Sequence, residues 1–354
     1  MQRDMERLLA ALQRIGNHPA SREHLLAALR QIETTIAYDG PIRDDISGPV
    51  ADAMFSEDMV MRKPLSNGVE LEFLYRSKIA REFVLSRPAV PDHAWEPQTT
   101  RLLTLLAGAG KAAIIGGAYF GDHATLVAKT LATHGGVCHA FEPNENQAAM
   151  LRRNAQINGL DNLVTSPLAL WRTSGARLRF AGDDALAATE PSDDDTSGIL
   201  TTTIDDYVSE RAIDAVAFIM LDIEGGELDA LRGATRQLGL PAPHAPTVVV
   251  EIHSAYVDWS NGLARTDIAE LLASFGYQMY ALRDYQGNAA MNDSPMELIP
   301  IDLVFTDGPR HGFNVLAVKD LSIIERPQFR VRKSRVSPKL LHHKDPALHQ
   351  PLAD

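Results

Sequence analysis

The sequence predicts an α/β fold in which a parallel sheet is covered by helices on both faces. Three observations predict it. From residue 112 onward, short apolar runs alternate with segments of helical periodicity. The apolar runs are nearly continuous, which is typical of strands buried on both faces. One of them, Val216–Leu221, leads directly into the acidic, glycine-containing segment Asp222–Glu227, and open α/β sheets bind ligands outside the carboxyl ends of their strands.

Residues 1–66 are expected to form a mostly helical extension. Two amphipathic helices are predicted between Glu6 and Ile36, separated by a break at Asn17–Pro19. Such helices bury their apolar stripes against a partner, so we expect them to contact a second subunit, as in a homodimer, or to cover the binding pocket as a lid. The two stripes consist of Leu8, Leu9, Leu12 and Ile15, and of Leu25, Leu26, Leu29 and Ile32.

The elements expected beyond this extension follow from apolar periodicity. Helices are expected over 99–106, 122–131, 145–157, 204–209, 228–238 and 268–275. Strands are expected over 69–73, 112–115, 137–141, 163–170, 216–221, 248–252, 278–282 and 303–305. Residues 190–198 are predicted to form a solvated, mobile loop, and 321–354 a basic, flexible tail that follows a domain spanning 67–320.

The composition limits the classes of function. Of the 354 residues, 45% are hydrophobic and 23% are charged, which is ordinary for a globular protein. The net charge of −12 argues against nucleic acid as the main partner, because phosphate backbones bind to basic surfaces. No apolar run is long enough to span a membrane, and the N-terminus has no apolar signal core. The single cysteine, Cys138, excludes disulfides within the chain, so a cytoplasmic protein is expected.

A glycine-rich turn follows the strand expected over 112–115. Gly116, Gly117 and Gly121 lie between this strand and the next helix, where glycines let the backbone approach a ligand closely. Their spacing does not fit the G-x-G-x-x-G pattern, which disfavours a nicotinamide-dependent dehydrogenase. About 20 residues further on, the next strand ends in Glu142, and an acid at that position can accept hydrogen bonds from both hydroxyls of a ribose. The combination favours a nucleoside-containing cofactor.

These motifs, with the Asp222 segment, resemble the FkbM-type family of S-adenosylmethionine-dependent methyltransferases. The resemblance runs from about Asn67 to about Phe305. It implies a Rossmann-like, class I methyltransferase sheet of seven strands, and O-methylation of a hydroxyl on a small-molecule acceptor, a sugar or another natural product. The matching motifs are Trp95-Glu96-Pro97, Gly117-Ala118-x-x-Gly121, Phe141-Glu142-Pro143, Leu151-x-x-Asn154-x-x-x-Asn158, Asp205-Asp206, Asp222-Ile223-Glu224-Gly225-x-Glu227, Leu231-Arg232-Gly233-Ala234 and Val250-Glu251-Ile252-His253.

The resemblance also implies where S-adenosylmethionine binds. In the family the glycine turn holds the methionine part of the cofactor, and the position of Glu142 holds the ribose. The chain departs from the family at Ile115, where Asp is usual, and at Tyr119, where Asn is usual. Asp122, just after the turn, could replace the missing carboxylate. The residues expected to bind the cofactor are Glu96, Gly117, Ala118, Tyr119, Gly121, Asp122, Glu142, Asn144 and Asp222.

Methyl transfer to a hydroxyl requires alignment of the attacking oxygen and a group that takes its proton. His253 is the first candidate for this base, since it follows a strand end and an imidazole ordinarily titrates near neutrality. Asp222 could orient the histidine or accept the proton itself, and Glu251 completes the expected catalytic set. The less favoured alternative is a divalent metal ion held by Asp222, Glu251 and His253. His123 and His134 are expected on helix surfaces.

A function of another class is left open by Ile115. With the usual Asp missing, the chain could be a catalytically weak methyltransferase fold that acts as a binding or assembly partner. Binding of S-adenosylmethionine and of its demethylated product separates the two readings.

Overall fold

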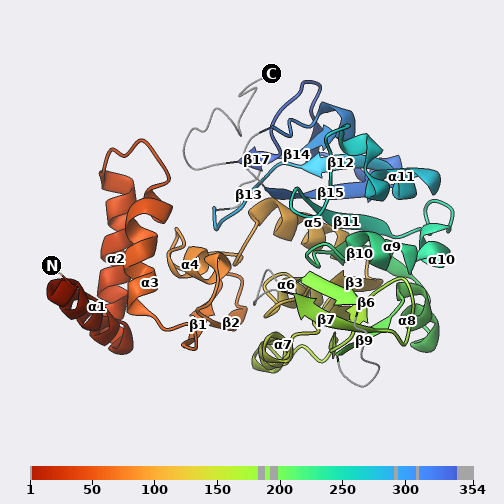
Figure 1. The fold of residues 1–354 in the computed structure, drawn as a ribbon. Helices are drawn as coiled ribbons and strands as arrows, with labels where there is room; N and C mark the ends of the chain where they lie inside the picture. The colour runs from red at the N-terminus through yellow and green to blue at the C-terminus, as the bar shows by residue number, and fades with distance from the viewer. Residues whose placement is uncertain (1, 182–187, 192–197, 291–293, 308–310, 341–354) are drawn as a thin grey trace.

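The computed structural model describes residues 2–181, 188–191, 198–290, 294–307 and 311–340, and its centre is a nine-stranded sheet (Figure 1). The strand order is β16-β14-β12-β15-β11-β10-β3-β4-β5. β3 and β10 lie side by side, so the chain order reverses between them, and open α/β sheets bind ligands at such a switch point. Five neighbouring strands are parallel, namely β5 (Leu163–Ser166), β4 (Cys138–Phe141), β3 (Ala112–Gly116), β10 (Val216–Leu221) and β11 (Thr247–His253).

The remaining strands of this sheet make it mixed rather than entirely parallel. β15 (Gly312–Val318) lies between β11 and β12 (Gln278–Leu282) and runs antiparallel to both. β14 (Met296–Pro300) and β16 (Phe329–Val331) extend the edge beyond β12. The order from β5 to β12, with the antiparallel β15 next to last, is that of the class I methyltransferase sheet, which confirms the predicted fold class.

The prediction of a strand over 303–305 is wrong. Residues 301–303 form a short 3₁₀ helix, and Val304 makes an isolated bridge with Val336. The strands β14 and β15 on either side of this segment were not predicted. Alternating strands and helices indicate parallel pairing, and that pattern carries no signal for an antiparallel strand added after the last helix.

Helices cover both faces of the sheet, as predicted (Figure 1). One face carries α5 (Pro97–Ala107), α6 (Ala124–Ala132) and α7 (Glu145–Ile157). The other carries α8 (Ile204–Glu210), α9 (Glu227–Arg232), α10 (Thr235–Leu238) and α11 (Asp267–Ser274). The helix predicted over 228–238 is divided at Gly233, where a Cβ atom would lie 2.2 Å from the carbonyl oxygen of Trp171.

A small second sheet begins just after β5 in the chain. The strand predicted over 163–170 is divided into β5 and β6 (Ala169–Leu170). β6 pairs with β9 (Ile199–Thr202), which pairs in turn with β7 (Arg177–Ala181) and, through it, β8 (Ala188–Pro191). Of the loop predicted over 190–198, residues 192–197 lie outside the described residues.

The N-terminal region forms a helical layer with its own core (Figure 1). It contains α1 (Gln2–Asn17), α2 (Pro19–Thr35), a π-helix (Arg43–Ser47) and α3 (Gly48–Met54). The hairpin of β1 (Val60–Pro64) and β2 (Glu70–Leu74), followed by α4 (Lys78–Val84), connects this layer to the sheet domain. A buried ion pair network joins α2 to α4, since Arg43 donates to Glu33 at 2.7 Å and to Glu82 at 2.6 Å.

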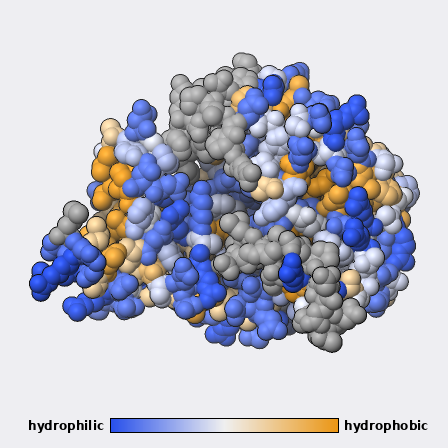
Figure 2. Space-filling model, viewed as in Figure 1, coloured by the Kyte–Doolittle hydropathy of each residue, from blue (hydrophilic) through white to orange (hydrophobic). Residues whose placement is uncertain are grey.

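Apolar side chains reach the surface on this layer (Figure 2). On α1, Met5, Leu8 and Leu9 are 56%, 53% and 42% exposed. No described residue of α1 or α2 lines the cavity introduced below, so of the two expectations for these helices the subunit contact is carried forward as a proposal. A helix stripe of this kind gains stability when a partner covers it.

We expect the double substitution Leu8→Glu/Leu9→Glu to convert a dimer into a monomer, because it places four charges in a two-fold contact. Sedimentation velocity at matched concentration measures the change. Arg14→Glu, on the opposite face of α1 by helical periodicity, is the control and should leave the dimer intact. A monomeric wild-type protein would contradict the proposal directly.

The segment predicted as a flexible tail differs in the part that the structure describes. Residues 329–331 form the edge strand β16, and β17 (Lys339–Leu340) pairs with β13 (Asp284–Tyr285). Arg332 is buried against Glu297, with 3.0 Å between guanidinium and carboxylate. Residues 341–354 lie outside the described residues.

Candidate active site

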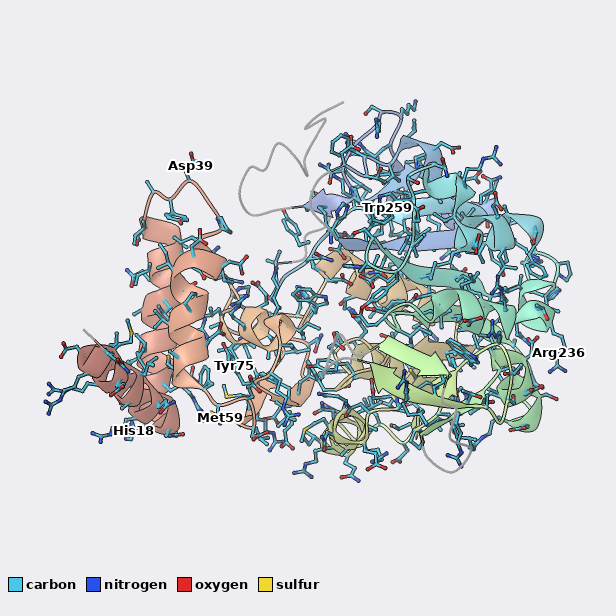
Figure 3. The ribbon with its side chains drawn as sticks, viewed as in Figure 1. His18, Asp39, Met59, Tyr75, Arg236 and Trp259 are labelled. Carbon is cyan, nitrogen blue, oxygen red and sulfur yellow. The ribbon has the colours of Figure 1, made fainter. Side chains whose placement is uncertain are left out.

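A cavity of about 550 Å³ lies at the carboxyl ends of β3, β4, β10 and β11. Its wall also includes the segment Arg76–Ile79, which joins β2 to α4 and follows Tyr75 (labelled in Figure 3). The segment that connects the N-terminal layer to the sheet domain thus forms part of this cavity. The predicted site residues that line it are Glu96, Gly117, Tyr119, Asp122, Glu142, Asn144, Asp222, Glu251 and His253. Two others, Ala118 and Gly121, are packed behind the turn.

The glycine turn is pressed against the end of β10. A Cβ atom on Gly117 would lie 1.7 Å from the carbonyl oxygen of Asp222, and the φ of Gly117 is +76°. Both the space and the backbone conformation therefore require glycine there. Tyr119 has a φ of +47°, a conformation that the family's usual Asn tolerates better than Tyr. Its hydroxyl donates to Ser77 Oγ at 3.1 Å, which ties the turn to the N-terminal side of the cavity.

Glu142 ends β4 with its carboxylate held by the backbone. Its Oε2 accepts from the amide of Tyr119 at 2.8 Å, and its Oε1 accepts from the amide of Asn144 at 2.8 Å. Asn144 itself caps α7 by accepting from the amides of Asn146 and Gln147. These contacts fix the orientation of the Glu142 carboxylate at the cavity wall.

Three carboxylates meet where β10 and β11 end. Asp222, Glu224 and Glu251 each offer an oxygen, and these oxygens lie within 4.8 Å of one another. Asp222 and Glu251 are joined by a side-chain hydrogen bond, which two carboxyl groups form when one of them is protonated. Burial raises the pKa of Asp222 to about 7, with Glu227 and Asp122 adding to the effect. Burial and then the neighbouring Asp222 raise the pKa of Glu224 to about 7 and hold that of Glu251 well above its usual range.

Two further buried polar residues, Glu96 and Lys339, interact electrostatically with Glu251 of this cluster. Glu96 accepts from Asn314 Nδ2 at 2.8 Å, and burial followed by the charge of Asp284 raises the pKa of Glu96 well above normal. Lys339 is 3% exposed, and its Nζ has no hydrogen-bond partner in the described part of the chain. Burial lowers the pKa of Lys339 to about 8 against the opposing charges of Glu96 and Glu251. Neither Asn314 nor Lys339 was expected at the site.

The histidines differ from what the sequence suggested. His253 Nδ1 accepts from the amide of Ala255 at 3.0 Å, which leaves the proton of the neutral ring on Nε2. That arrangement weakens His253 as a proton acceptor. The placement of His123 on a helix surface is wrong: it is 7% exposed, lines the cavity, and its Nδ1 lies 3.0 Å from Thr100 Oγ1. Its position just before α6 puts it against α5 rather than in solvent.

The chemistry of this donor set permits a divalent cation. Carboxylate oxygens are the ligands that Mg²⁺ and Ca²⁺ prefer. In the described residues the group with suitable spacing is Asp222, Glu224 and Glu251. Glu224 therefore takes the place that the sequence analysis gave to His253. Glu227, by contrast, is the first residue of α9, and it accepts from the amides of Ile223 and Gly225 in the loop that precedes this helix.

The raised pKa values predict an unusual pH dependence of stability. The pKa values of Asp222, Glu224 and Glu227 are about 7 in the folded protein and about 4 in an unfolded chain, so the folded state binds more protons between these values. The stabilisation present at low pH is therefore lost as pH rises through about 7. We expect the free energy of unfolding of the ligand-free protein, measured with urea, to be lower by a few kcal/mol at pH 8 than at pH 5.5.

A matched variant identifies the source of this effect. Asp222→Asn removes one of the coupled carboxyls and should flatten the pH profile, whereas Glu145→Gln, on an exposed turn of α7, should leave it unchanged. A stability that stays level or increases from pH 5.5 to 8 in the wild type would contradict the assignment.

The strand order is that of a class I methyltransferase fold, and the cavity lies at the carboxyl ends of its strands. The family model described as the methyltransferase FkbM domain matches residues 116–279, just under half of the chain. The match supports the resemblance that the motifs indicated, and it covers the glycine turn, Glu142, Asp222 and Glu251. No helix of the described residues is both long and apolar enough to cross a bilayer.

Solved structures with partial similarity are also methyltransferases. The FkbM methyltransferase of Methylobacillus flagellatus is 16% identical with a TM-score of 0.32; the match covers 59% of this chain and 43% of that one. The Bacillus cereus O-methyltransferase, solved with SAH, is 14% identical over 68% and 90% of the two chains, with a TM-score of 0.35. A SAM-dependent methyltransferase of Agrobacterium tumefaciens is 11% identical over 74% and 70%, with a TM-score of 0.36. No curated protein matches the chain significantly.

Proposed function

We propose that this protein is an S-adenosylmethionine-dependent O-methyltransferase that acts on a hydroxyl of a sugar or another natural product. One observation carries the proposal: the turn after β3, Glu142 and the carboxylates at the ends of β10 and β11 all face one cavity. The FkbM domain over residues 116–279 supports methyl transfer as the reaction. The single cysteine fits the cytoplasmic location expected above.

The cofactor side of the cavity suits S-adenosylmethionine. The turn at Gly116 and Gly117 presents bare backbone to the cavity, and the carboxylate of Glu142 is oriented to accept from ribose hydroxyls. Asp122 lines the cavity and offers a carboxylate near the turn, while Ile115 is 1% exposed inside the sheet. When bound, the cofactor supplies a methyl group activated by a sulfonium. The protein's own task is then alignment and proton removal.

Asp222 is the residue that we assign to proton removal. A base works best when its pKa lies near the working pH, and the pKa of Asp222 is about 7. Its hydrogen bond to Glu251 fixes its direction and lets the pair hold the proton that leaves the acceptor hydroxyl. His253, whose Nδ1 is engaged by Ala255, would then act by orienting the acceptor.

The acceptor side of the cavity is polar, which supports a hydroxyl-rich small molecule. Arg76 and Lys78 line the cavity from the segment between β2 and α4, and Glu224 and Gln286 line it from the sheet domain. A sugar presents hydroxyls that can donate to carboxylates and accept from cations. A divalent ion at Asp222, Glu224 and Glu251 remains the alternative means of lowering the hydroxyl's pKa.

Calorimetric titration with S-adenosylmethionine and S-adenosylhomocysteine tests the proposal first. We expect both to bind, followed by transfer of labelled methyl to members of a panel of sugars and glycosylated natural products. Transfer that survives EDTA assigns the proton to Asp222, and transfer restored by Mg²⁺ assigns it to the metal scheme. Cofactor binding without transfer to any acceptor supports the binding-partner hypothesis, which the replacement of the usual Asp by Ile115 left open. Absence of cofactor binding contradicts the proposal.

A further inference from the structure

Gly312 lies next to two residues that line the cavity, Glu251 and His253. It is the first residue of β15 and pairs with His253 of β11, while Glu251 pairs with Asn314. Directly opposed residues of an antiparallel pair project to the same face, as do residues two apart in one strand. Gly312 therefore lies on the face that carries the side chains of Glu251 and His253, and both of those line the cavity.

Because Gly312 has no side chain, Glu251 and His253 can occupy the space where its Cβ atom would lie. A Cβ atom at this position would lie 2.1 Å from Glu251 Oε1 and 2.6 Å from His253 Cδ2. The φ of Gly312 lies outside the left-handed region, so its backbone conformation does not require glycine. The requirement is one of space alone.

The backbone of Gly312 holds a third wall residue. Gln286, which also lines the cavity, donates from Nε2 to the Gly312 carbonyl oxygen at 3.1 Å. One glycine on an antiparallel strand is thus in contact with an acid, an imidazole and an amide of the acceptor side.

We propose that Gly312 is a positioning residue that sets where the Glu251 carboxylate and the His253 ring stand relative to the acceptor. The proposal rests on the function proposed above, since it gives these side chains an acceptor to face. Glu251 is hydrogen-bonded to Asp222, so a displaced Glu251 carboxylate also moves the partner of the proposed base.

Gly312→Ala tests the proposal without unfolding the strand. The atoms that the new methyl group would meet first belong to the ends of side chains rather than to backbone, so Glu251 and His253 can move while β15 stays. A displacement of about 1 Å in an active site costs about 10²-fold in turnover. We expect that loss, with S-adenosylmethionine affinity changed by less than about twofold, because Glu142 and the glycine turn lie elsewhere in the cavity.

A matched glycine serves as the control. Gly108, which follows α5, has a negative φ, is exposed, and would place a Cβ atom no closer than 3.2 Å to any neighbour. Gly108→Ala should leave turnover and cofactor affinity unchanged.

A readout that does not depend on activity separates this proposal from the proposed function. The side-chain ¹⁵N resonances of His253, identified by their loss in His253→Gln, report its tautomer and surroundings. We expect them to shift in Gly312→Ala and to stay in place in Gly108→Ala. If the protein transfers no methyl group, the shift still supports the placement while the proposed function fails.

Trimming the two neighbours provides the last arm of the test. In a Glu251→Asp/His253→Ala background the clash is relieved, so adding Gly312→Ala should cost less than about threefold in turnover, a coupling expected only between groups in contact. An equal cost in both backgrounds, or unchanged His253 resonances in Gly312→Ala, would overturn the proposal.

Discussion

Asp222→Asn is expected to lower turnover by about 10²–10⁴-fold, the usual contribution of a positioned proton acceptor. The substitution keeps the size of the side chain and removes its capacity to take a proton. Asp222 is attached to the end of β10, lines the cavity and has a pKa of about 7. Steady-state kinetics with the acceptor found by the transfer assay measure the effect. Cofactor affinity should change less than turnover, because Asn keeps an oxygen that can accept a hydrogen bond and most of the expected cofactor contacts come from other residues.

The pH profile and two further variants separate Asp222 from its neighbours. Turnover of the wild type should fall as pH decreases through about 7, since the base becomes protonated. His253→Ala should cost less than Asp222→Asn, because the Nδ1 of His253 is already engaged by Ala255. Asp229→Asn, on α9 and paired with Arg172 at 3.2 Å, is the control and should leave turnover unchanged. Normal turnover in Asp222→Asn would show that Asp222 and Glu251 do not take the proton.

The sequence predicted the parts of the site that follow strand ends. Asp222, Glu142 and Glu251 were identified because acids after buried apolar runs have few structural explanations, and the parallel sheet brings those ends together. The alternation of strands and helices was enough to predict both helix layers. Local pattern and known topology therefore predict that these side chains line one cavity, and the roles assigned to them are proposals.

Residues brought in by pairing between distant segments could not be predicted in this way. Lys339 belongs to a stretch whose charges indicate a solvated tail, and its burial depends on pairing of β17 with β13 near Asp284. Asn314 and Gly312 act through β15, an antiparallel strand that the alternating pattern does not signal. His123 shows the same limit, because the sequence of a helix start does not show which neighbour covers it. Sequence reasoning therefore misses residues that only the pairing or packing of distant segments brings to the site.

The second large effect is expected on cofactor affinity, through recognition of the ribose. Glu142→Ala should weaken binding of S-adenosylmethionine and S-adenosylhomocysteine by about 10²–10⁴-fold. Two charge-assisted hydrogen bonds are lost, each worth about 1.5–3 kcal/mol, and about 1.4 kcal/mol corresponds to tenfold. Isothermal titration calorimetry measures the loss directly. Turnover at saturating cofactor should recover, because Glu142 lies away from the carboxylates that take the proton.

Glu142 also accepts from the amides of Tyr119 and Asn144. Its substitution could therefore weaken cofactor binding by loosening the glycine turn, and this effect has to be distinguished from the loss of a ribose contact. A 2′-deoxy analogue of S-adenosylhomocysteine makes this distinction. If Glu142 binds the ribose, Glu142→Ala should cost the deoxy analogue much less affinity than it costs the parent compound, since a hydroxyl and its partner interact only when both are present. Equal losses for both ligands would assign Glu142 to the turn alone. Glu145→Ala, on the exposed first turn of α7, should alter neither affinity.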